Sequence, residues 1–492
     1  MTRVRAVDEA DVEAVASWLD LTFAAGEAAD AADRLDTLAG IYADLEDVPV
    51  DAMDDRGGED RFVAPPVRPG PDEDPHNAWL QRFDLRRPGD GPLSGLDVAI
   101  KDNTCVRGVE ITCGSRALEG FAPAGHAAVV DRVLDAGGRI VGKTNMDELA
   151  FGPTSETSAY GATLNPRDRD HVAGGSSSGS AAAVAAGEAD LALGTDTGGS
   201  VRIPASYCGI VGLKPTYGRV SLHGIVELAY SMDHAGPLAR DVETAAVGLD
   251  AFADDPPARG DSYAGAVGDV APEDLTVGVS EAAYRTHVSA AVEGTVRDEV
   301  AALESAGAEV VDVEIPPLAH SRPGWWGIAP VEFAAAYLTN GVGLWRHGRA
   351  EESLTAALTR LRRSDSRHLG TNVKEMLALG AHLLTTHDGY HYARARSYRA
   401  VLREAFDDAL ADVDILVGPG TPTTAQEVDG FERGVTPPVN WNTHPTNLTG
   451  HPSVVLPCGE DDDGLPVSLQ FVAPWGAERD LLAAAAAYER DV

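Results

Sequence analysis

Two glycine- and serine-rich segments, residues 174–180 and 194–200, carry the residue types that nucleophilic catalysis needs. Ser200 directly follows residues 197–199, whose successive backbone N–H groups lie beside its hydroxyl. Small residues let a backbone approach a reacting carbonyl closely, so that its N–H groups can stabilise an oxyanion. One such cluster is typically a flexible turn. Two of them, each next to a short regular element, favour a pair of catalytic loops with Ser200 as the nucleophile.

A serine nucleophile needs a base, and Lys101 is the candidate. This lysine directly follows the apolar run 96–100, which predicts a position at the buried end of a central strand. Burial disfavours the charged amine, so a lysine there can be neutral and accept a proton. A salt bridge between Lys101 and Asp102 is the structural alternative. The chain also has 14 histidines, but none lies in a sequence context that singles it out.

The main body of the chain alternates predicted strands and helices. The expected strands cover residues 96–100, 139–141, 190–193, 309–314 and 415–417, and the expected helices cover 127–136, 181–187, 291–306 and 397–411. This alternation predicts an α/β fold, in which helices cover both faces of a central mixed, largely parallel β-sheet.

Three segments are predicted along the chain. Residues 1–50 form a small N-terminal helical extension, because apolar residues recur there at helical spacing. Residues 51–76 are rich in Asp, Gly and Pro, which predicts a linker without regular structure. Residues 77–492 form a single catalytic domain.

The charge balance is strongly acidic, with 39 basic against 77 acidic residues, a net charge of −38 and a pI near 4.6. Such a surface repels phosphate backbones and anionic lipids, so neither nucleic acid nor a membrane is an expected partner. The acidic residues are spread along the whole chain and lysine is almost absent. Because salt screens self-repulsion, this combination predicts a halophilic protein.

The remaining composition predicts a cytoplasmic protein. The four cysteines form no C-x-x-C pair, which indicates neither a zinc site nor a disulfide framework. The first residues lack the apolar core of a signal peptide. No run of about 18 apolar residues, the length that crosses a membrane, occurs in the sequence.

Several segments together resemble the amidase-signature family. They are VAIKDN at 98–103, NMDELAFG at 145–152, GGSSSGSAAAVAAG at 174–187, GTDTGGSVRIPASYCGIVGLKPT at 194–216, SMDHAGPLARD at 231–241 and NLTGHPSVVLPCG at 447–459. The spacing of Lys101, Ser176 and Ser200 also fits the family. The resemblance extends from about residue 75 to residue 485.

The resemblance implies an amidase that cleaves a carboxamide to a carboxylate and ammonia through an acyl-enzyme. Ser200 would be the acylated nucleophile and Lys101 the neutral base. Ser176, joined to Gly175 by a cis peptide bond, would pass the proton between them. The oxyanion hole would consist of the backbone N–H groups of Thr197, Gly198, Gly199 and Ser200, and the loops would be held by Ser177, Asp196 and Arg202. Neither a cofactor nor a metal ion is required.

Other motifs compete with this interpretation. Residues 137–144 match the phosphate-binding pattern G-x-x-x-x-G-K-T, but a predicted helix precedes the motif and a predicted strand lies inside it. Residues 175–179 match the nucleophile-elbow pattern G-x-S-x-G, but the stretch before them is polar and turn-like. A Ser-His-Asp set with His444 or His451 is a further alternative. So is a binding protein that keeps the fold.

Within the family, the middle of the chain most resembles the glutamine-hydrolysing A subunit of the tRNA-dependent amidotransferase, which supplies ammonia to an acylated tRNA. That protein grips glutamine with an arginine in a V-K-R-R stretch and with an aspartate. This chain has Val-Lys-Glu-Met at residues 373–376 and Asn440 at the second position. An unpaired zwitterion in a buried site costs several kcal/mol. We therefore expect a free-standing amidase, with the glutamine-hydrolysing amidotransferase component as the alternative.

The substrate partner is expected to be a small-molecule amide with an apolar or aromatic acyl group. The variable segments that form the family's pocket walls are rich in aromatic residues here, and such side chains favour apolar ligands. They are Trp325, Trp326, Phe333, Trp345 and Trp441. A homodimer is left open.

Overall fold

The computed structural model describes residues 6–43, 60–255, 262–284, 287–341, 351–430 and 438–492, and it divides into the units Met1–Glu59 and Asp60–Val492. In the first unit, helices α1 (Glu9–Trp18) and α2 (Glu27–Ala43) pack through Val12, Ala28 and Ala32. The Asp8 carboxylate caps α1 by accepting the backbone N–H of Asp11. No described helix is long and apolar enough to cross a membrane.

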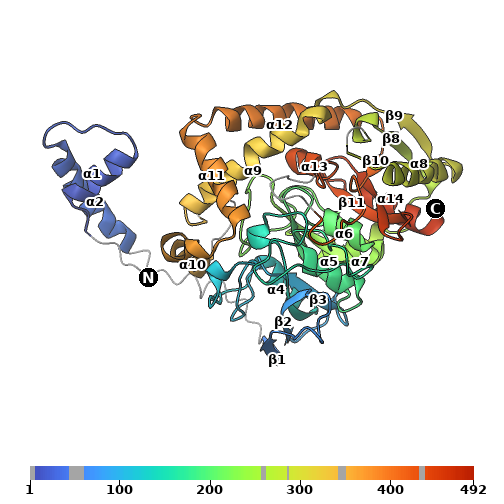
Figure 1. Cartoon of the computed structure of the whole chain (residues 1–492), viewed down its shortest axis with the longest axis horizontal. Coiled ribbons are helices and arrows are strands. Elements are labelled where there is room, and N and C mark those ends of the chain that lie inside the picture. Colours follow the sequence, from blue (N-terminus) through green and yellow to red (C-terminus); the bar gives the residue numbers. More distant parts are fainter. Residues whose placement is uncertain (1–5, 44–59, 256–261, 285–286, 342–350, 431–437) are drawn as a thin grey trace. The chain divides into compact units, whose positions relative to one another are not determined.

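A sheet of twelve described strands runs through the second unit (Figure 1). The strands are β1 (Arg61–Val67), β2 (Trp79–Arg86), β3 (Asp97–Lys101), β4 (Arg139–Thr144), β5 (Leu191–Asp196), β6 (Val211–Lys214), β7 (His234–Ala239), β8 (Thr276–Val279), β9 (Glu309–Asp312), β10 (Ile415–Pro419), β11 (Ser453–Glu460) and β12 (Pro466–Val472). Their order across the sheet is β1-β2-β4-β3-β5-β7-β6-β11-β12-β10-β8-β9. The predicted α/β fold with a mixed sheet is confirmed.

The sheet is less parallel than expected. Parallel pairing is confined to β4-β3-β5 and β10-β8-β9, where helical crossovers join the strands. All the other neighbouring strands, including the central β7-β6-β11-β12, pair antiparallel. β11 and β12 form a hairpin, a connection that only antiparallel strands allow.

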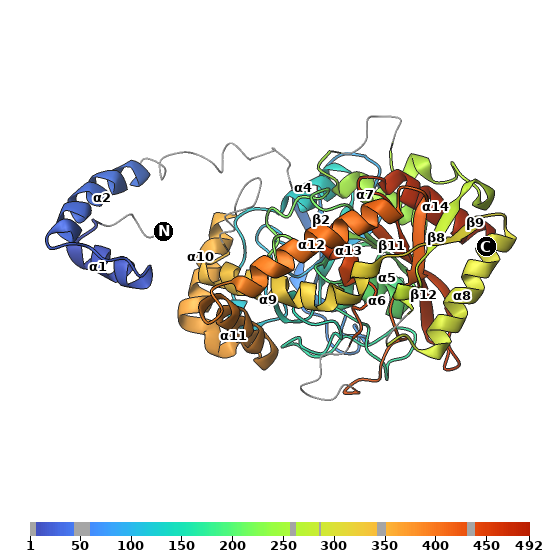
Figure 2. The same cartoon turned by 90° about the horizontal axis from the view of Figure 1, so that it is seen from above.

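Helices cover both faces of this sheet (Figure 2). The helices described in this unit are α4 (Ala128–Asp135), α5 (Ser178–Ala185), α6 (Arg202–Cys208), α7 (Val242–Phe252), α8 (Ala290–Ser305), α9 (Ser321–Leu338), α10 (Glu352–Arg360), α11 (Thr371–Thr385), α12 (Tyr390–Ala409), α13 (His444–Thr449) and α14 (Glu478–Asp491). Helix α5 packs on β3, β4, β5 and β7. Helix α9 packs against α11, α12 and α13.

The predicted linker at residues 51–76 contains a strand. β1 pairs with β2 along one edge of the sheet, and all seven of its residues are exposed. Pro65 and Pro66 lie within it, and an edge strand tolerates proline because one side of its backbone needs no partner. The composition of this segment indicated a loop, but pairing with β2 makes residues 61–67 a strand.

Alternation along β3 decides which way the candidate base points. Val98 and Ile100 belong to the cluster that includes α4 and α7, whereas Ala99 packs with the alanines of α5. Side chains two residues apart share a face of a strand. Lys101, the last residue of β3, therefore lies on the α5 side, where small residues let the helix approach closely.

Candidate active site

The candidate base lies at the junction of β3, β5 and the loop before α5. The Lys101 Nζ donates hydrogen bonds to Ser176 Oγ and to Thr195 Oγ1, each over 2.8 Å. Asn103 Nδ2 donates to the same threonine hydroxyl at 3.1 Å. The lysine and Ser176 are completely buried, and Lys101 makes no ion pair with Asp102, whose carboxylate instead lies 3.1 Å from Lys143. The salt-bridge alternative is therefore wrong.

Burial lowers the pKa of Lys101 to about 7, because the charged amine loses its hydration. The buried carboxylates of Asp147, Asp196 and Asp233 oppose this shift but do not cancel it. A substantial fraction of the amine is consequently neutral near neutral pH, which is the state a base requires.

The two loops are joined mainly through Ser177. Its backbone N–H donates to the Ser200 carbonyl at 3.1 Å, and its hydroxyl donates to the Thr195 carbonyl at 3.1 Å. The Gly175–Ser176 peptide bond is cis. No hydrogen bond joins the Ser176 and Ser200 hydroxyls among the described residues, which differs from expectation. Catalytic hydrogen bonds are often formed fully only around a bound reactant.

The predicted oxyanion loop differs from expectation at one residue. The backbone N–H of Gly199 donates to Asp196 Oδ1 at 2.8 Å, so it is occupied within the protein. In the described part of the chain, the N–H groups of Thr197, Gly198 and Ser200 have no protein acceptor. These three donors can therefore receive a developing negative charge.

Asp196 and Arg202 hold the loop from behind. Both side chains are completely buried, and their ion pair measures 3.0 Å. Burial alone would raise the pKa of Asp196, but the charge and hydrogen bond of Arg202, together with Lys214 and Asn447, hold the pKa well below its ordinary value. Arg202 also donates to acceptors on α13 and β12, which are Thr446 Oγ1, Asn447 Oδ1 and Gln470 Oε1. The predicted supporting residues thus connect the loop to two distant elements.

Neither candidate histidine is bonded to Ser200. His444 Nδ1 lies 2.6 Å from the Asn440 carbonyl, and His451 Nε2 lies 2.9 Å from Asp407 Oδ1. Burial lowers the pKa of each histidine to about 4. The described structure therefore offers no Ser-His-Asp set at this position.

The two competing motifs also lack their required context. Residues 137–144 end in strand β4, so the segment is extended where a phosphate loop must curl. No described strand lies directly before residues 175–179, as a nucleophile elbow requires.

Aromatic side chains form one wall beside the oxyanion loop. Trp325 packs against Trp326 and Phe151 with ring centroids 5.3 and 6.2 Å apart, and Phe151 packs against Phe333 at 5.4 Å. The Trp325 ring lies so close to Gly198 that a Cβ there would come within 3.0 Å of Nε1. Three of the predicted wall residues thus form one cluster.

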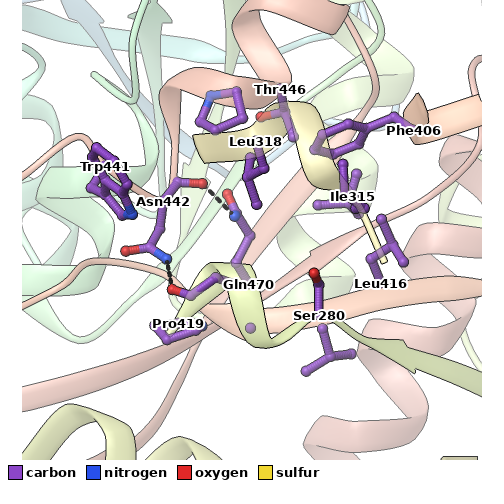
Figure 3. A pocket seen from close by; sticks show the side chains of 15 residues that line it. Ser280, Ile315, Leu318, Phe406, Leu416, Pro419, Trp441, Asn442, Thr446 and Gln470 are labelled. Carbon is purple, nitrogen blue, oxygen red and sulfur yellow. Dashed lines mark hydrogen bonds between the residues drawn. The ribbon is translucent and has the colours of Figure 1, made fainter. Parts of the chain in front are cut away.

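The other two aromatic residues predicted for this wall are not part of the cluster. Trp345 lies outside the described residues. Trp441 lines a separate cavity with Ile315, Phe406 and Leu416 (Figure 3). None of the candidate catalytic residues lines that cavity, so the prediction for Trp441 is not supported.

The positions of the expected glutamine anchors carry no arginine or aspartate. Lys374 is exposed and donates to the Arg367 carbonyl at 3.3 Å, while Val373 is buried in the core. Asn440 accepts through its backbone carbonyl the N–H groups of Thr443 and His444.

Sequence reasoning missed four residues that shape the site. They are Asp147, Thr195, Asp233 and Asn447. Asp147 accepts the N–H groups of Ser155 and Thr157, and Asp233 accepts the Thr197 hydroxyl at 2.6 Å. All four lie inside the segments that resemble the amidase-signature family, which was the available signal.

The fold is a mixed sheet with helices on both faces, and the site consists of two glycine-rich loops with a buried lysine between them. This combination is typical of a hydrolase of mixed α/β architecture. The family model described as Amidase matches residues 77–482. The chain therefore belongs to the amidase-signature family, as its sequence predicted, and is an enzyme that acts on amides.

Relatives and solved structures agree with this assignment. The chain is 42% identical over 436 residues to the A subunit of the glutamyl-tRNA(Gln) amidotransferase of Natronomonas pharaonis, covering 84% of this chain and 99% of the relative. Identity to the corresponding protein of Haloarcula marismortui is 40% over 433 residues, with the same coverages.

Among structures, the A subunit of the glutamyl-tRNA(Gln) amidotransferase of Thermotoga maritima superposes with a TM-score of 0.71 at 32% identity, covering 85% of this chain and 88% of that one. The native peptide amidase of Stenotrophomonas maltophilia gives a TM-score of 0.68 at 34% identity, covering 81% and 83%.

Proposed function

We propose that the chain hydrolyses a carboxamide through an acyl-enzyme, with Ser200 as nucleophile, Ser176 as proton relay and Lys101 as base. The observation that carries this proposal is the 2.8 Å hydrogen bond from the buried Lys101 amine to Ser176. A lowered pKa at Lys101 supports it, because a protonated amine could not accept the proton.

The reaction begins when Ser200 Oγ attacks the amide carbon. Its proton passes to Ser176, whose own proton passes to the neutral Lys101 amine. The negative charge on the former carbonyl oxygen is received by the free N–H groups of Thr197, Gly198 and Ser200. Lys101 then returns the proton through Ser176 to the leaving nitrogen. Ammonia departs, and water hydrolyses the remaining ester by the same route.

Glutamine is the substrate that the relatives favour. Two relatives, 42% and 40% identical to this chain, are each the A subunit of a glutamyl-tRNA(Gln) amidotransferase, and the match covers 99% of each relative. On this interpretation the chain releases ammonia from glutamine as one component of an assembly. A tRNA then belongs among the reactants of that assembly, so the acidic charge is no ground for excluding nucleic acid.

A free-standing amidase is the second candidate, and one specific observation favours it. Asn440 and residues 373–376 provide no arginine or aspartate for the charged ends of glutamine. The aromatic wall formed by Trp325 and its neighbours would instead suit an apolar acyl group. The peptide amidase among the similar structures has the same fold.

Ammonia release from a panel of amides at high salt tests the proposal. The panel contains glutamine, asparagine and neutral alkyl and aryl amides, with Ser200→Ala as the matched control. Turnover of glutamine alone supports the amidotransferase component, and turnover of neutral amides without glutamine supports the free-standing enzyme. Equal rates for the unmodified chain and Ser200→Ala would overturn the catalytic assignment.

A further inference from the structure

The free N–H groups of the oxyanion loop are oriented by hydrogen bonds on the opposite side of their peptide planes. In a planar trans peptide, the C=O of one residue and the N–H of the next point in opposite directions. A donor that fixes the carbonyl therefore also fixes the direction of the following N–H.

Each of the three free N–H groups has such a donor behind it. The Asp196 carbonyl, which precedes the Thr197 N–H, accepts Asn447 Nδ2 at 3.0 Å. The Gly199 carbonyl, which precedes the Ser200 N–H, accepts the N–H of Ile203 at 2.6 Å. Asn447 is itself bonded to Arg202, and Ile203 lies in α6, the helix that directly follows the loop.

The donor behind the Gly198 N–H comes from a different part of the fold. The Thr197 carbonyl accepts the indole Nε1–H of Trp325, on α9, at 2.9 Å. On the next peptide, Thr443 Oγ1 donates to the Gly198 carbonyl at 2.8 Å, which turns the Gly199 N–H toward Asp196. Trp325 is buried and its ring is held by Phe151, so the indole is fixed in direction.

We propose that Trp325 is a positioning residue of the reaction, which aims the Gly198 N–H into the oxyanion hole by holding the Thr197 carbonyl. This inference rests on the proposed function, because it needs an oxyanion to form beside Ser200. It also gives Trp325 two tasks, since the same ring forms part of the aromatic wall.

The Trp325→Phe variant tests this proposal, because phenylalanine keeps an aromatic ring and removes the indole N–H. Loss of a whole oxyanion donor lowers kcat by about a hundredfold to a thousandfold, so loss of its orientation should lower kcat by about tenfold to a hundredfold. KM should change by less than about threefold, because the hydrogen bond acts mainly in the transition state.

Trp79→Phe is the matched control. Trp79 is also buried, but it lies on β2 and its Nε1 donates to Glu188 Oε2 at 2.6 Å, whereas the Nε1 of Trp325 donates to the oxyanion loop. A general effect of losing a buried indole hydrogen bond would appear in both variants. Only Trp325→Phe should lose kcat.

A boronic acid matched to the best amide of the panel supplies a second readout. Its tetrahedral adduct with Ser200 resembles the intermediate, so its affinity should fall in Trp325→Phe by the same factor as kcat/KM, while that of the carboxylate product should not. Equal kcat in Trp325→Phe and Trp79→Phe, or equal loss of boronate and product affinity, would overturn the positioning role. An unmodified chain that releases no ammonia would instead refute the proposed function.

Discussion

Lys101 is subject to two opposing influences, and their balance determines when it can act as a base. Burial lowers its pKa to about 7 from an ordinary value of 10.5, while nearby buried carboxylates act in the opposite direction. The amine is neutral above its pKa and protonated below it. We therefore expect kcat/KM to rise with pH through about 7 and to become constant above. A pH–rate profile of ammonia release measures this, and a rise only near the ordinary lysine value would contradict it.

Replacement of the same lysine should separate amide from ester hydrolysis. On the proposed mechanism, Lys101→Ala removes both the base for Ser200 and the acid that protonates the leaving nitrogen, so amide hydrolysis should fall by at least about a thousandfold. Ester hydrolysis should fall less, because an alkoxide leaves with less help from an acid. The measurement is the amide-to-ester rate ratio for a matched pair of substrates. An unchanged ratio would mean that Lys101 does not protonate the leaving group.

Residue types and their context pointed to Lys101 and Ser200, and the resemblance to the amidase-signature family added Ser176; their catalytic roles stay predictions. Residue types and context were not enough to find the donor to the Thr197 carbonyl, because Trp325 is more than a hundred residues away along the chain and meets the loop only through tertiary packing. A different, local limit applies to Gly199, because residue types do not show how the loop backbone turns. Its N–H was predicted to be free, but the Asp196 carboxylate, three residues earlier, turns back to accept it.

At the scale of elements, the buried Asp196–Arg202 pair joins the loop after β5 to α13 and β12. Arg202→Met should lower the free energy of unfolding by about 3–5 kcal/mol, because it leaves a buried carboxylate without its partner. Urea unfolding measures the change. The control is Arg240→Met, which removes the partly exposed Arg240–Asp190 pair and should cost about 0–1 kcal/mol. Similar losses in both variants would contradict a special role for Arg202.

An element can be predicted from the sequence when its own residues determine it, and not when it forms only by pairing with distant parts of the chain. β3, β5 and α5 were predictable because apolar runs and an alanine-rich stretch determine them locally. The antiparallel centre of the sheet was not, since β6 and β11 lie far apart in the chain and pair only in the folded protein. β1 was missed because its composition is that of a linker.

For the whole molecule, the dominant quantity is the net charge of −38. Unscreened, this charge repels itself across the surface, so the melting temperature should fall as potassium chloride is reduced from about 3 M to about 0.1 M. Scanning calorimetry measures the shift. Sucrose, which is excluded from protein surfaces but does not screen charge, serves as the control and should not replace the salt. An unchanged melting temperature would refute the halophilic prediction.

The scarcity of lysine has a practical consequence for coupling chemistry. Of the chain's four lysines, Lys101, Lys143 and Lys214 are completely buried, whereas Lys374 on α11 is exposed. Activated esters and aldehydes react with accessible amines, and Lys374 is the exposed one of these four lysines. A dye or a solid support attached through a lysine would therefore be joined at one side chain of defined position. The buried amine of Lys101 would be spared without any protecting group.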